Sequence, residues 1–228
     1  MSSASTGSTL SSDRPVVLSD AGDRPESSLE DMNVFVVSGD PIVGSLVDAY
    51  RSTLAEAGEP DWQTAIPPSF RPINRSAFHV VVDPIGRPVA VSNTTLGKID
   101  ELSLAPYVDP MNVPAGLICE CPSIAVLPEG RIEGLTELLY RSMYTFARRQ
   151  GARWLMSFVD PLTLTLFRDE GIMFRALGRV TTHQGFEAVV IGEELRVIEG
   201  HLARARPEFL AFLTEAFTDE ERVRFELP

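Results

Sequence analysis

Hydrophobic and polar positions follow two different periods along the chain, and each change of period marks the boundary of a predicted element. Four apolar residues at 34–37 predict a short strand. Apolar residues then recur at helical spacing through 41–57, after an Asp-Pro pair suited to a helix start, and predict a helix. The proline-rich stretch 59–72 predicts a loop. Two apolar runs, 78–82 and 88–94, flank a short turn and predict a hairpin.

The second half of the chain alternates strands and helices. The apolar run 117–126 predicts a buried strand, and the spacing over 132–150 predicts a long amphipathic helix. A strand at 154–159 and a short helix at 162–170 follow, and a glycine comes directly after each helix, as is common at helix ends. The inner stripe of the long helix consists of Ile132, Leu135, Leu138, Leu139, Met143 and Phe146.

The C-terminal pattern completes the predicted fold. Residues 174–179 and 186–191 predict a final hairpin, and residues 193–217 predict helix that is broken near Pro207. Residues 100–107 fit either a short helix or a loop. Strands joined by a helix run parallel, whereas hairpin strands run antiparallel. The order of elements therefore predicts an α/β fold with a mixed sheet and helices on both faces, in which 117–126 and 154–159 are parallel neighbours.

Composition predicts one domain behind a tail. The 228 residues are 44% hydrophobic, which is enough to bury a core of single-domain size. Residues 1–31 are mainly Ser, Asp, Gly, Thr and Pro, and such a segment cannot bury enough apolar surface to offset the entropy of ordering. We therefore expect a disordered tail at 1–31 and a single domain at 32–228.

Charge and cysteine content disfavour several classes of function. The formal net charge of −12 disfavours binding to nucleic acid or to anionic membranes. No apolar run approaches the roughly 20 residues of a membrane helix, and the N-terminus lacks the order of a signal peptide. Cys119 and Cys121 are poorly placed to form a disulfide with each other, and no nearby histidine completes a metal site. These features predict a cytoplasmic protein without a metal.

The apolar run at 117–126, LICECPSIAV, contains a proline in its middle. Pro122 cannot donate a ladder hydrogen bond, so the strand must be bulged or splayed there. A splayed strand leaves backbone groups free to bind a ligand. The chain then turns after Val126 into the long helix, whose first amides lack internal partners and favour an anion. The sequence therefore predicts a site for an extended ligand with a phosphate at one end.

Glu120 is the carboxylate of this stretch. In a regular strand it points away from the face that Cys119 and Cys121 share. Burial raises the pKa of a carboxyl group and suits it to act as a general base near neutral pH. A structural glutamate, bonded to backbone or to an arginine, also fits this position, and spacing alone favours it.

The order of motifs after residue 117 resembles that of the autoinducer (acyl-homoserine lactone) synthases and the long-chain N-acyl amino acid synthases. Both families belong to the GNAT acyltransferase superfamily. Their strand E-x-S-R-F-x-V corresponds to ECPSIAV at 120–126, and their Arg-x-x-Gly and Leu-Gly steps correspond to 168–171 and 177–178. The resemblance covers about 33–194 and implies a GNAT-like mixed, splayed central sheet flanked by helices.

The resemblance also implies an activity. Members of these families move an acyl group from the thioester of an acyl carrier protein, or of coenzyme A, to an amine, and Glu120 falls on their proposed general base. Main-chain amides near Val126 would polarise the thioester, and the following turn would hold the pantetheine phosphate. The implied site residues are Glu120 and Ser123 for catalysis, and Val126, Leu127, Gly130, Arg131 and Ile132 for the acyl-phosphopantetheine of the donor.

Departures from the family pattern keep other functions open. Ser123 replaces an arginine and is better suited to donate a hydrogen bond than to act as a nucleophile, and Asn93, Thr94 and Thr95 lie where a second arginine is usual. These losses argue against S-adenosylmethionine as the acceptor. The degenerate phosphate loop mildly favours a carrier protein over free coenzyme A. The alternatives are a small-molecule N-acetyltransferase that uses acetyl-coenzyme A, and a catalytically inactive GNAT-fold protein that binds a carrier.

Four arginines gather around the end of the long helix. They are Arg141, Arg148, Arg149 and Arg153. Helical spacing predicts a solvated face, whereas the acidity of the rest of the chain makes a docking patch for an acidic carrier protein equally plausible. Both interpretations stay open.

Overall fold

The computed structural model describes residues 32–38, 76–86, 88–122, 124–126, 134–183 and 186–227. The predicted tail at 1–31, the helix at 41–57 and the loop at 59–72 lie outside these residues. The strands are β1 (Asn33–Ser38), β2 (Ser76–Val82), β3 (Pro88–Gly97), β4 (Ile118–Cys121), β5 (Ile124–Val126), β6 (Trp154–Val159), β7 (Arg175–Ala176), β8 (Thr181–His183) and β9 (Phe186–Glu194).

The helices follow the predicted order along the second half of the chain. They are α3 (Leu135–Arg149), α4 (Pro161–Asp169), α5 (Leu195–Ala205), α6 (Pro207–Thr214) and α7 (Asp219–Phe225). Three 3₁₀ turns, η2 (Ile99–Glu101), η3 (Ala105–Tyr107) and η4 (Pro110–Asn112), lie between β3 and β4. The segment 100–107, which fits either a helix or a loop in sequence, is therefore built from short 3₁₀ turns.

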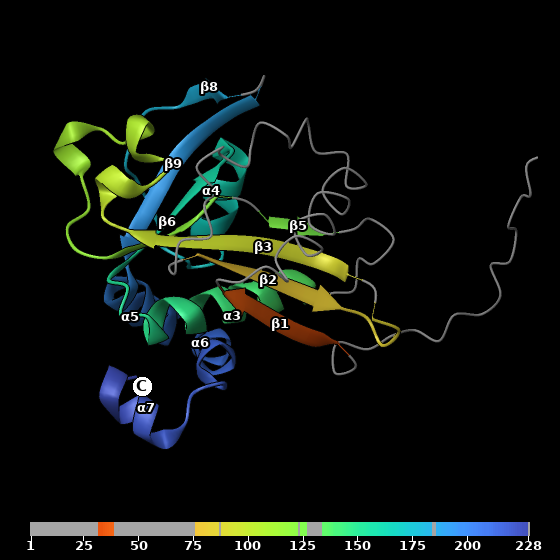
Figure 1. Ribbon diagram of the computed structural model, residues 1–228. Coiled ribbons are helices and arrows are strands. Elements are labelled where there is room, and N and C mark those ends of the chain that lie inside the picture. Colours follow the sequence, from red (N-terminus) through yellow and green to blue (C-terminus); the bar gives the residue numbers. More distant parts are fainter. Residues whose placement is uncertain are drawn as a thin grey trace, which may run out of the picture.

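The described strands form one mixed sheet of nine strands (Figure 1). The order is β1-β2-β3-β4-β6-β9-β7, with β5 paired to β3 and β8 paired to β9. The pair β4–β6 is parallel, and the remaining pairs are antiparallel. This confirms the predicted α/β class, the β2–β3 hairpin and the parallel neighbours.

The end of the chain differs from the prediction in three places. Helix α7 lies beyond 217, where the predicted helix ends. The predicted strand at 174–179 is reduced to β7, and a further short strand, β8, lies outside the predicted range; both pair with β9. Pairing stops between them because the carbonyl of Leu177 accepts a hydrogen bond from the amide of Asp109 (2.8 Å), in another segment. The predicted helix at 193–217 begins only at Leu195, since Glu193 and Glu194 still pair with β6. The predicted break at Pro207 is confirmed.

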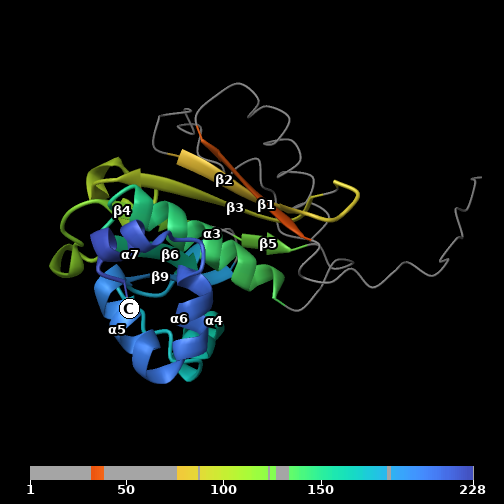
Figure 2. The same cartoon turned by 90° about the horizontal axis from the view of Figure 1, so that it is seen from below.

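Each face of the sheet has its own core. On one face, α3 packs over Cys119 and Cys121, and residues of α4, α5, α6 and α7 pack against the same cluster. Figure 2 shows α3, α5, α6 and α7 on the same side of the sheet. On the other face, Ile118, Trp154 and Met156 pack against leucines of the 3₁₀ segment. The described α-helices thus cover one face, and the 3₁₀ segment covers part of the other.

The backbone at its two ends sets the length of α3. Gly134, with φ of 94°, precedes the helix, so α3 begins at Leu135 and not at the predicted 132. Gly151, with φ of 76°, follows the helix and confirms the predicted stop. The predicted inner stripe is buried at Leu135, Leu138, Leu139 and Met143, and Phe146 packs half-buried against the same core.

His79 is a fully buried polar residue on the α3 face of β2. Its Nδ1 lies 2.7 Å from Ser142 Oγ on α3, and its Nε2 lies 3.0 Å from Thr94 Oγ1 on β3. The ring also meets the edge of Phe146, with centroids 5.6 Å apart. Both nitrogens therefore have partners, which is how a neutral imidazole is satisfied in a core.

We expect His79 to make folding stability fall in acid. Burial lowers the pKa of His79 from 6.5 to about 3, so the unfolded chain binds a proton that the folded chain does not. The free energy of unfolding should decrease as the pH falls from about 6.5 towards about 3, by up to about 1.4 kcal/mol per pH unit. Denaturant titrations of wild type and His79→Gln measure this, and the stability gap between the two should narrow in acid. A constant gap would contradict a neutral, buried His79.

Candidate active site

The strand that carries Glu120 is broken by a bulge. β3 pairs first with β4, where Thr95 lies opposite Glu120, and then with β5, where Ser92 lies opposite Ile124. An unbroken ladder would bring Ser92 opposite the residue before Ile124. One extra residue is thus inserted next to Pro122, as the missing N–H of proline predicts.

The bulge changes which side chains share a face. Glu120 and Thr95 form a cross-strand pair on one face, while Ile124 and Val126 join the cysteines in the core under α3. Cys119 and Cys121 are buried free thiols on that α3 face. The prediction that Glu120 points away from the cysteines is confirmed.

The sheet splits directly after Glu120. The parallel pairing of β4 with β6 ends where Cys121 meets Ser157, whose hydroxyl donates to the Cys121 carbonyl (2.7 Å). Beyond this point β5 pairs with β3, whereas Phe158 and Val159 of β6 pair with β9. Within the described residues, β5 and the end of β6 are therefore not paired to each other, and the predicted splay is confirmed.

A turn of the 3₁₀ segment holds the Glu120 side chain. The hydroxyl of Ser103 donates to Oε1 in a short hydrogen bond, and the backbone N–H of Leu104 donates to Oε2 (3.0 Å). Glu120 is only 2% exposed. Its surroundings raise and lower its pKa at once: burial is the largest effect and raises it, while the hydrogen bonds from Ser103 and Leu104 lower it. The net result is a raised pKa.

The turn is fixed by contacts on both sides. Leu102 and Leu104 are buried in the core below it, while Ser103 between them is exposed. Further along, the ring of Tyr107 lies 5.3 Å from the ring of Phe158 on β6. The backbone of the 3₁₀ segment packs directly against Gly178, because a Cβ on residue 178 would lie 2.0 Å from the Tyr107 carbonyl oxygen.

Neutral polar side chains continue the Glu120 face across the sheet. Thr95 lies opposite Glu120, and its hydroxyl lies 3.2 Å from that of Ser76 on β2. Asn93, two residues along β3, is buried on the same face. The structure therefore places hydroxyl and amide groups beside the carboxylate at positions where the sequence comparison expected an arginine.

Of the predicted site residues, Glu120 and Val126 lie within the described part of the chain. Val126 is the last residue of β5 and is half-buried. Ser123, Leu127, Gly130, Arg131 and Ile132 lie outside the described residues, and their predicted roles stay predictions. Ser103 was missed in the sequence, because nothing in its local pattern distinguishes it from other loop serines.

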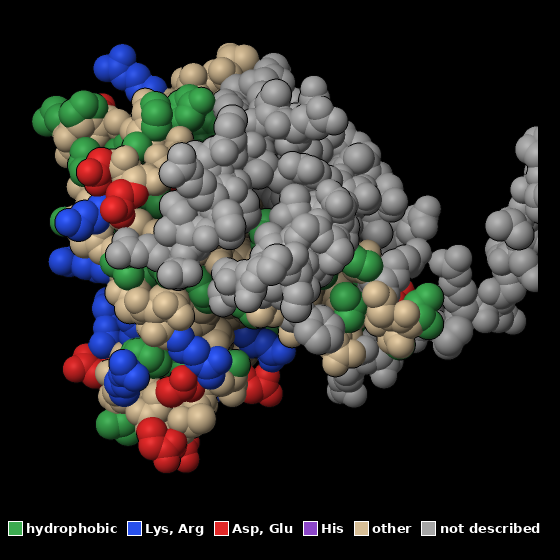
Figure 3. Space-filling view, in the orientation of Figure 1, with side chains coloured by type: hydrophobic (Ala, Val, Ile, Leu, Met, Phe, Trp, Pro, Cys, Tyr) green, Lys and Arg blue, Asp and Glu red, His purple; other side chains and the backbone are tan. Residues whose placement is uncertain are grey.

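The four arginines near the end of α3 all form ion pairs with carboxylates. The partners of Arg141, Arg148, Arg149 and Arg153 are Glu215, Glu199, Glu221 and Glu194, with N···O distances of 2.6, 3.2, 2.8 and 2.9 Å. In Figure 3, basic and acidic side chains alternate over the lower part of the molecule, where α5, α6 and α7 lie. These arginines thus bind the C-terminal segments and β9, which supports a structural role over a docking patch.

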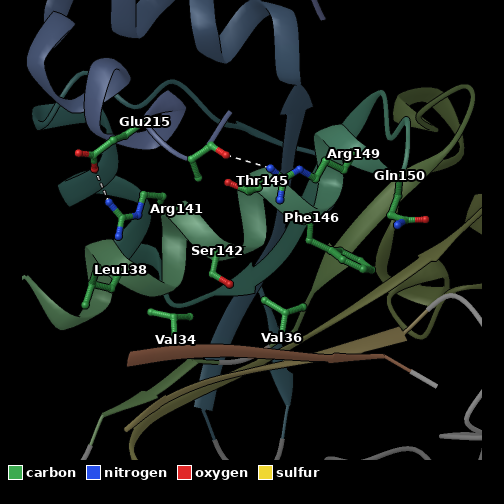
Figure 4. A pocket seen from close by; sticks show the side chains of 11 residues that line it. Val34, Val36, Leu138, Arg141, Ser142, Thr145, Phe146, Arg149, Gln150 and Glu215 are labelled. Atoms are coloured by element: carbon green, nitrogen blue, oxygen red, sulfur yellow. Dashed lines mark hydrogen bonds and ion pairs between the residues drawn. The ribbon is translucent and has the colours of Figure 1, made fainter. Parts of the chain in front are cut away.

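A separate hollow of about 500 Å³ lies between β1 and α3 (Figure 4). Val34, Val36 and Phe146 form apolar walls, and Arg141 and Arg149 lie along its side. This hollow is on the α3 face of the sheet, opposite the face to which Glu120 points. It therefore belongs to a different part of the molecule from the split.

The described ranges contain neither a metal-binding group nor a membrane-spanning helix. No group of three or more His, Cys, Asp or Glu side chains there could hold a metal ion. None of the helices described is long and apolar enough to cross a membrane.

Many solved structures match this fold, and three of them illustrate the likeness. BjaI, a CoA-dependent acyl-homoserine lactone synthase solved with SAM and isopentyl-CoA, matches with a TM-score of 0.59 and 14% identity over 86% of this chain and 90% of its own. FeeM, an N-acyl amino acid synthase from uncultured soil microbes, matches with a TM-score of 0.58 and 11% identity, over 76% of this chain and 97% of its own. TofI, solved in a ternary complex with an inhibitor and MTA, matches with a TM-score of 0.52 and 15% identity, over 78% of this chain and 99% of its own.

At these identities the likeness establishes the fold. The chain has the GNAT-like fold of the acyl-homoserine lactone and N-acyl amino acid synthases, as expected from the motifs at 120–126 and 168–171. No family model matches the chain, and no curated protein does.

Proposed function

We propose that this protein is an N-acyltransferase that moves an acyl group from a thioester to an amine, with Glu120 as the general base. The observation that carries the proposal is the split between β5 and the end of β6, which begins one residue after Glu120, where the pairing of β4 with β6 ends at Cys121. A buried carboxylate with a raised pKa thus lies next to the point where the two strands separate. The fold shared with BjaI, an acyl-homoserine lactone synthase, and with FeeM, an N-acyl amino acid synthase, supports the same assignment.

The split suits the extended arm of an acyl thioester. Pantetheine contains two amides, and strands that do not pair with each other leave backbone N–H and C=O groups for such a ligand. In this proposal the amide of Val126 polarises the thioester carbonyl. The turn with Leu127, Gly130, Arg131 and Ile132 receives the phosphate, helped by the amides at the start of the following helix.

The chemistry requires a base because amines are protonated at neutral pH. Glu120 accepts a proton from the ammonium group, and the nitrogen lone pair then attacks the thioester carbon. The tetrahedral intermediate collapses as the C–S bond breaks, and the thiol leaves with a proton. The acyl group is not transferred to the enzyme at any step, so Ser123 serves as a hydrogen-bond donor.

The donor is the carrier-bound or CoA-bound acyl thioester. BjaI is described as CoA-dependent, which supports coenzyme A. The arginines for which carrier docking was one of two open interpretations are paired within the molecule, so a carrier would have to use another surface. We retain the acyl carrier protein as the expected partner because the predicted phosphate loop is degenerate. A small amine or amino acid is the acceptor, contacted by Thr95, Asn93 and Ser76.

Intact-mass spectrometry tests the proposal. An acyl-loaded carrier protein, long-chain acyl-CoA and acetyl-CoA are each incubated with the protein and a pool of amino acids and amines. We expect loss of a long acyl group that depends on the presence of an amine, and a product mass that identifies the acceptor. Consumption of acetyl-CoA alone would instead establish a small-molecule N-acetyltransferase.

One observation favours an alternative function. Both carboxylate oxygens of Glu120 already accept hydrogen bonds from the 3₁₀ segment, as in a purely structural glutamate. This arrangement favours a catalytically inactive protein that binds a carrier. In the same experiment it predicts a carrier complex, with no acyl transfer from any of the three donors.

A further inference from the structure

Among the described residues, Ser103 is the side chain that links the carboxylate of Glu120 to the surface of the molecule. Glu120 itself is 2% exposed, whereas Ser103, which donates to its Oε1, is an exposed residue. The second oxygen, Oε2, accepts the backbone N–H of Leu104. A backbone amide can only donate, whereas a hydroxyl both donates and accepts. Ser103 is thus the contact through which a proton can pass to or from the carboxylate.

The fold holds this serine in place. Its two neighbours, Leu102 and Leu104, are each 6% exposed and anchor the turn in the core beside Ile118 and Met156. Ser103 between the two leucines is exposed, while its hydroxyl reaches the buried carboxylate of Glu120. The hydroxyl of Ser103 therefore stands between the buried carboxylate and the outside of the molecule.

We propose that Ser103 relays the proton between the amine acceptor and Glu120. This inference rests on the proposed acyltransferase function and assigns the group that touches the acceptor. The N–H bond of the ammonium breaks as its proton passes to Ser103 Oγ. At the same time the Ser103 O–H bond breaks and its proton passes to Glu120 Oε1. The serine ends unchanged, the carboxylate is protonated, and the amine is free to attack the thioester.

The described surroundings of Glu120 contain few other groups that could relay a proton to its carboxylate. On the Glu120 face, β3 and β6 place Thr95 and Met156 next to the carboxylate, and neither titrates in the physiological range. The titratable groups of the adjoining segments are Lys98, Asp100, Glu101, Tyr107 and Asp109 on the 3₁₀ segment, and Cys119 and Cys121 on the opposite face of β4. Among the hydrogen bonds described for the carboxylate, the Ser103 contact is the side-chain one.

Three substitutions test the relay. Ser103→Ala removes the hydroxyl, Ser103→Thr keeps it, and Asp100→Asn changes an exposed residue of the same segment as a matched control. We expect Ser103→Ala to lower kcat/KM by about thirtyfold, while Ser103→Thr and Asp100→Asn retain most of the activity. The hydrogen bond from Ser103 lowers the pKa of Glu120, so its loss should move the acid limb of the kcat/KM profile to higher pH. An unmoved limb would show that Ser103 does not bond to Glu120, and the difference in kcat/KM between the alanine and threonine variants separates a proton relay from a structural hydrogen bond.

A second readout does not depend on activity. Carbon-13 NMR follows the carboxyl group of Glu120, assigned by comparison with Glu120→Gln, and the titration should move to higher pH in Ser103→Ala. Equal kcat/KM in Ser103→Ala and wild type, or equal losses in the alanine and threonine variants, would overturn the relay while acyl transfer itself stands. No acyl transfer by wild type would overturn the proposed function and the relay with it. The NMR titration would still show whether Ser103 bonds to Glu120.

Discussion

Glu120→Gln should abolish acyl transfer, with kcat/KM lower by about a thousandfold. Glutamine has the shape of glutamate but cannot accept a proton, so the amine stays protonated and cannot attack. Single-turnover assays with an acyl thioester and the acceptor identified by mass spectrometry measure the loss. We expect thioester binding to be retained, because the split between β5 and β6 is formed by the backbone.

Glu120→Gln should lose its acyl-transfer activity without unfolding. The folded-state pKa of Glu120 is raised above that of the unfolded chain, so its contribution to stability is present in acid and decreases as the pH rises. A neutral side chain removes this dependence, and Glu120→Gln should therefore remain folded at neutral pH. Full acyl-transfer activity in a folded Glu120→Gln protein would show that Glu120 is structural and is not the general base.

Gly178→Ala should destabilise the protein by about 3 kcal/mol and also lower its activity. The added Cβ would lie 2.0 Å from the carbonyl oxygen of Tyr107, which is backbone and cannot rotate away. The segment 98–112 would have to shift, which would break the hydrogen bond from Asp109 to the Leu177 carbonyl. The same shift would pull Ser103 away from Glu120. Thermal unfolding should show a midpoint lower by about 10 °C.

Gly200→Ala provides the matched control for this substitution. Gly200 lies within α5, and the nearest atom to an added Cβ is the flexible end of Arg204 at 3.9 Å. Alanine is a better helix former than glycine, so this variant should be more stable by up to about 1 kcal/mol, with unchanged activity. A Gly178→Ala protein as stable as wild type would contradict the close contact between the segment and Gly178.

The local pattern of the sequence determined the elements and the break in the key strand. The largely apolar run at 154–159 predicted β6, helical spacing predicted α3, and Gly151 predicted the end of α3. The missing N–H of Pro122 predicted a bulge, and strand alternation placed Glu120 away from the cysteines. These features depend on neighbouring residues alone, because backbone geometry and hydrogen-bonding capacity are properties of each residue.

The partners of polar groups could not be predicted in this way. Glu120 meets Ser103, which is 17 residues away, and Arg149 meets Glu221, which is 72 residues away. The choice between a structural and a docking role for the arginines depended on carboxylates in helices whose positions the sequence left open. The interruption between β7 and β8 likewise followed from a contact of Leu177 with a distant amide.

The sequence by itself therefore determined the fold class, the bulge at Pro122 and the face on which Glu120 lies. Only the tertiary structure decided that the carboxylate is cradled by Ser103 and Leu104, and that the arginines of α3 bind the C-terminal segments. The physical reason is that secondary structure follows from short-range sterics and hydrogen bonding. The pairing of distant side chains follows from the summed packing of many weak contacts, which brings remote segments together only in the folded chain.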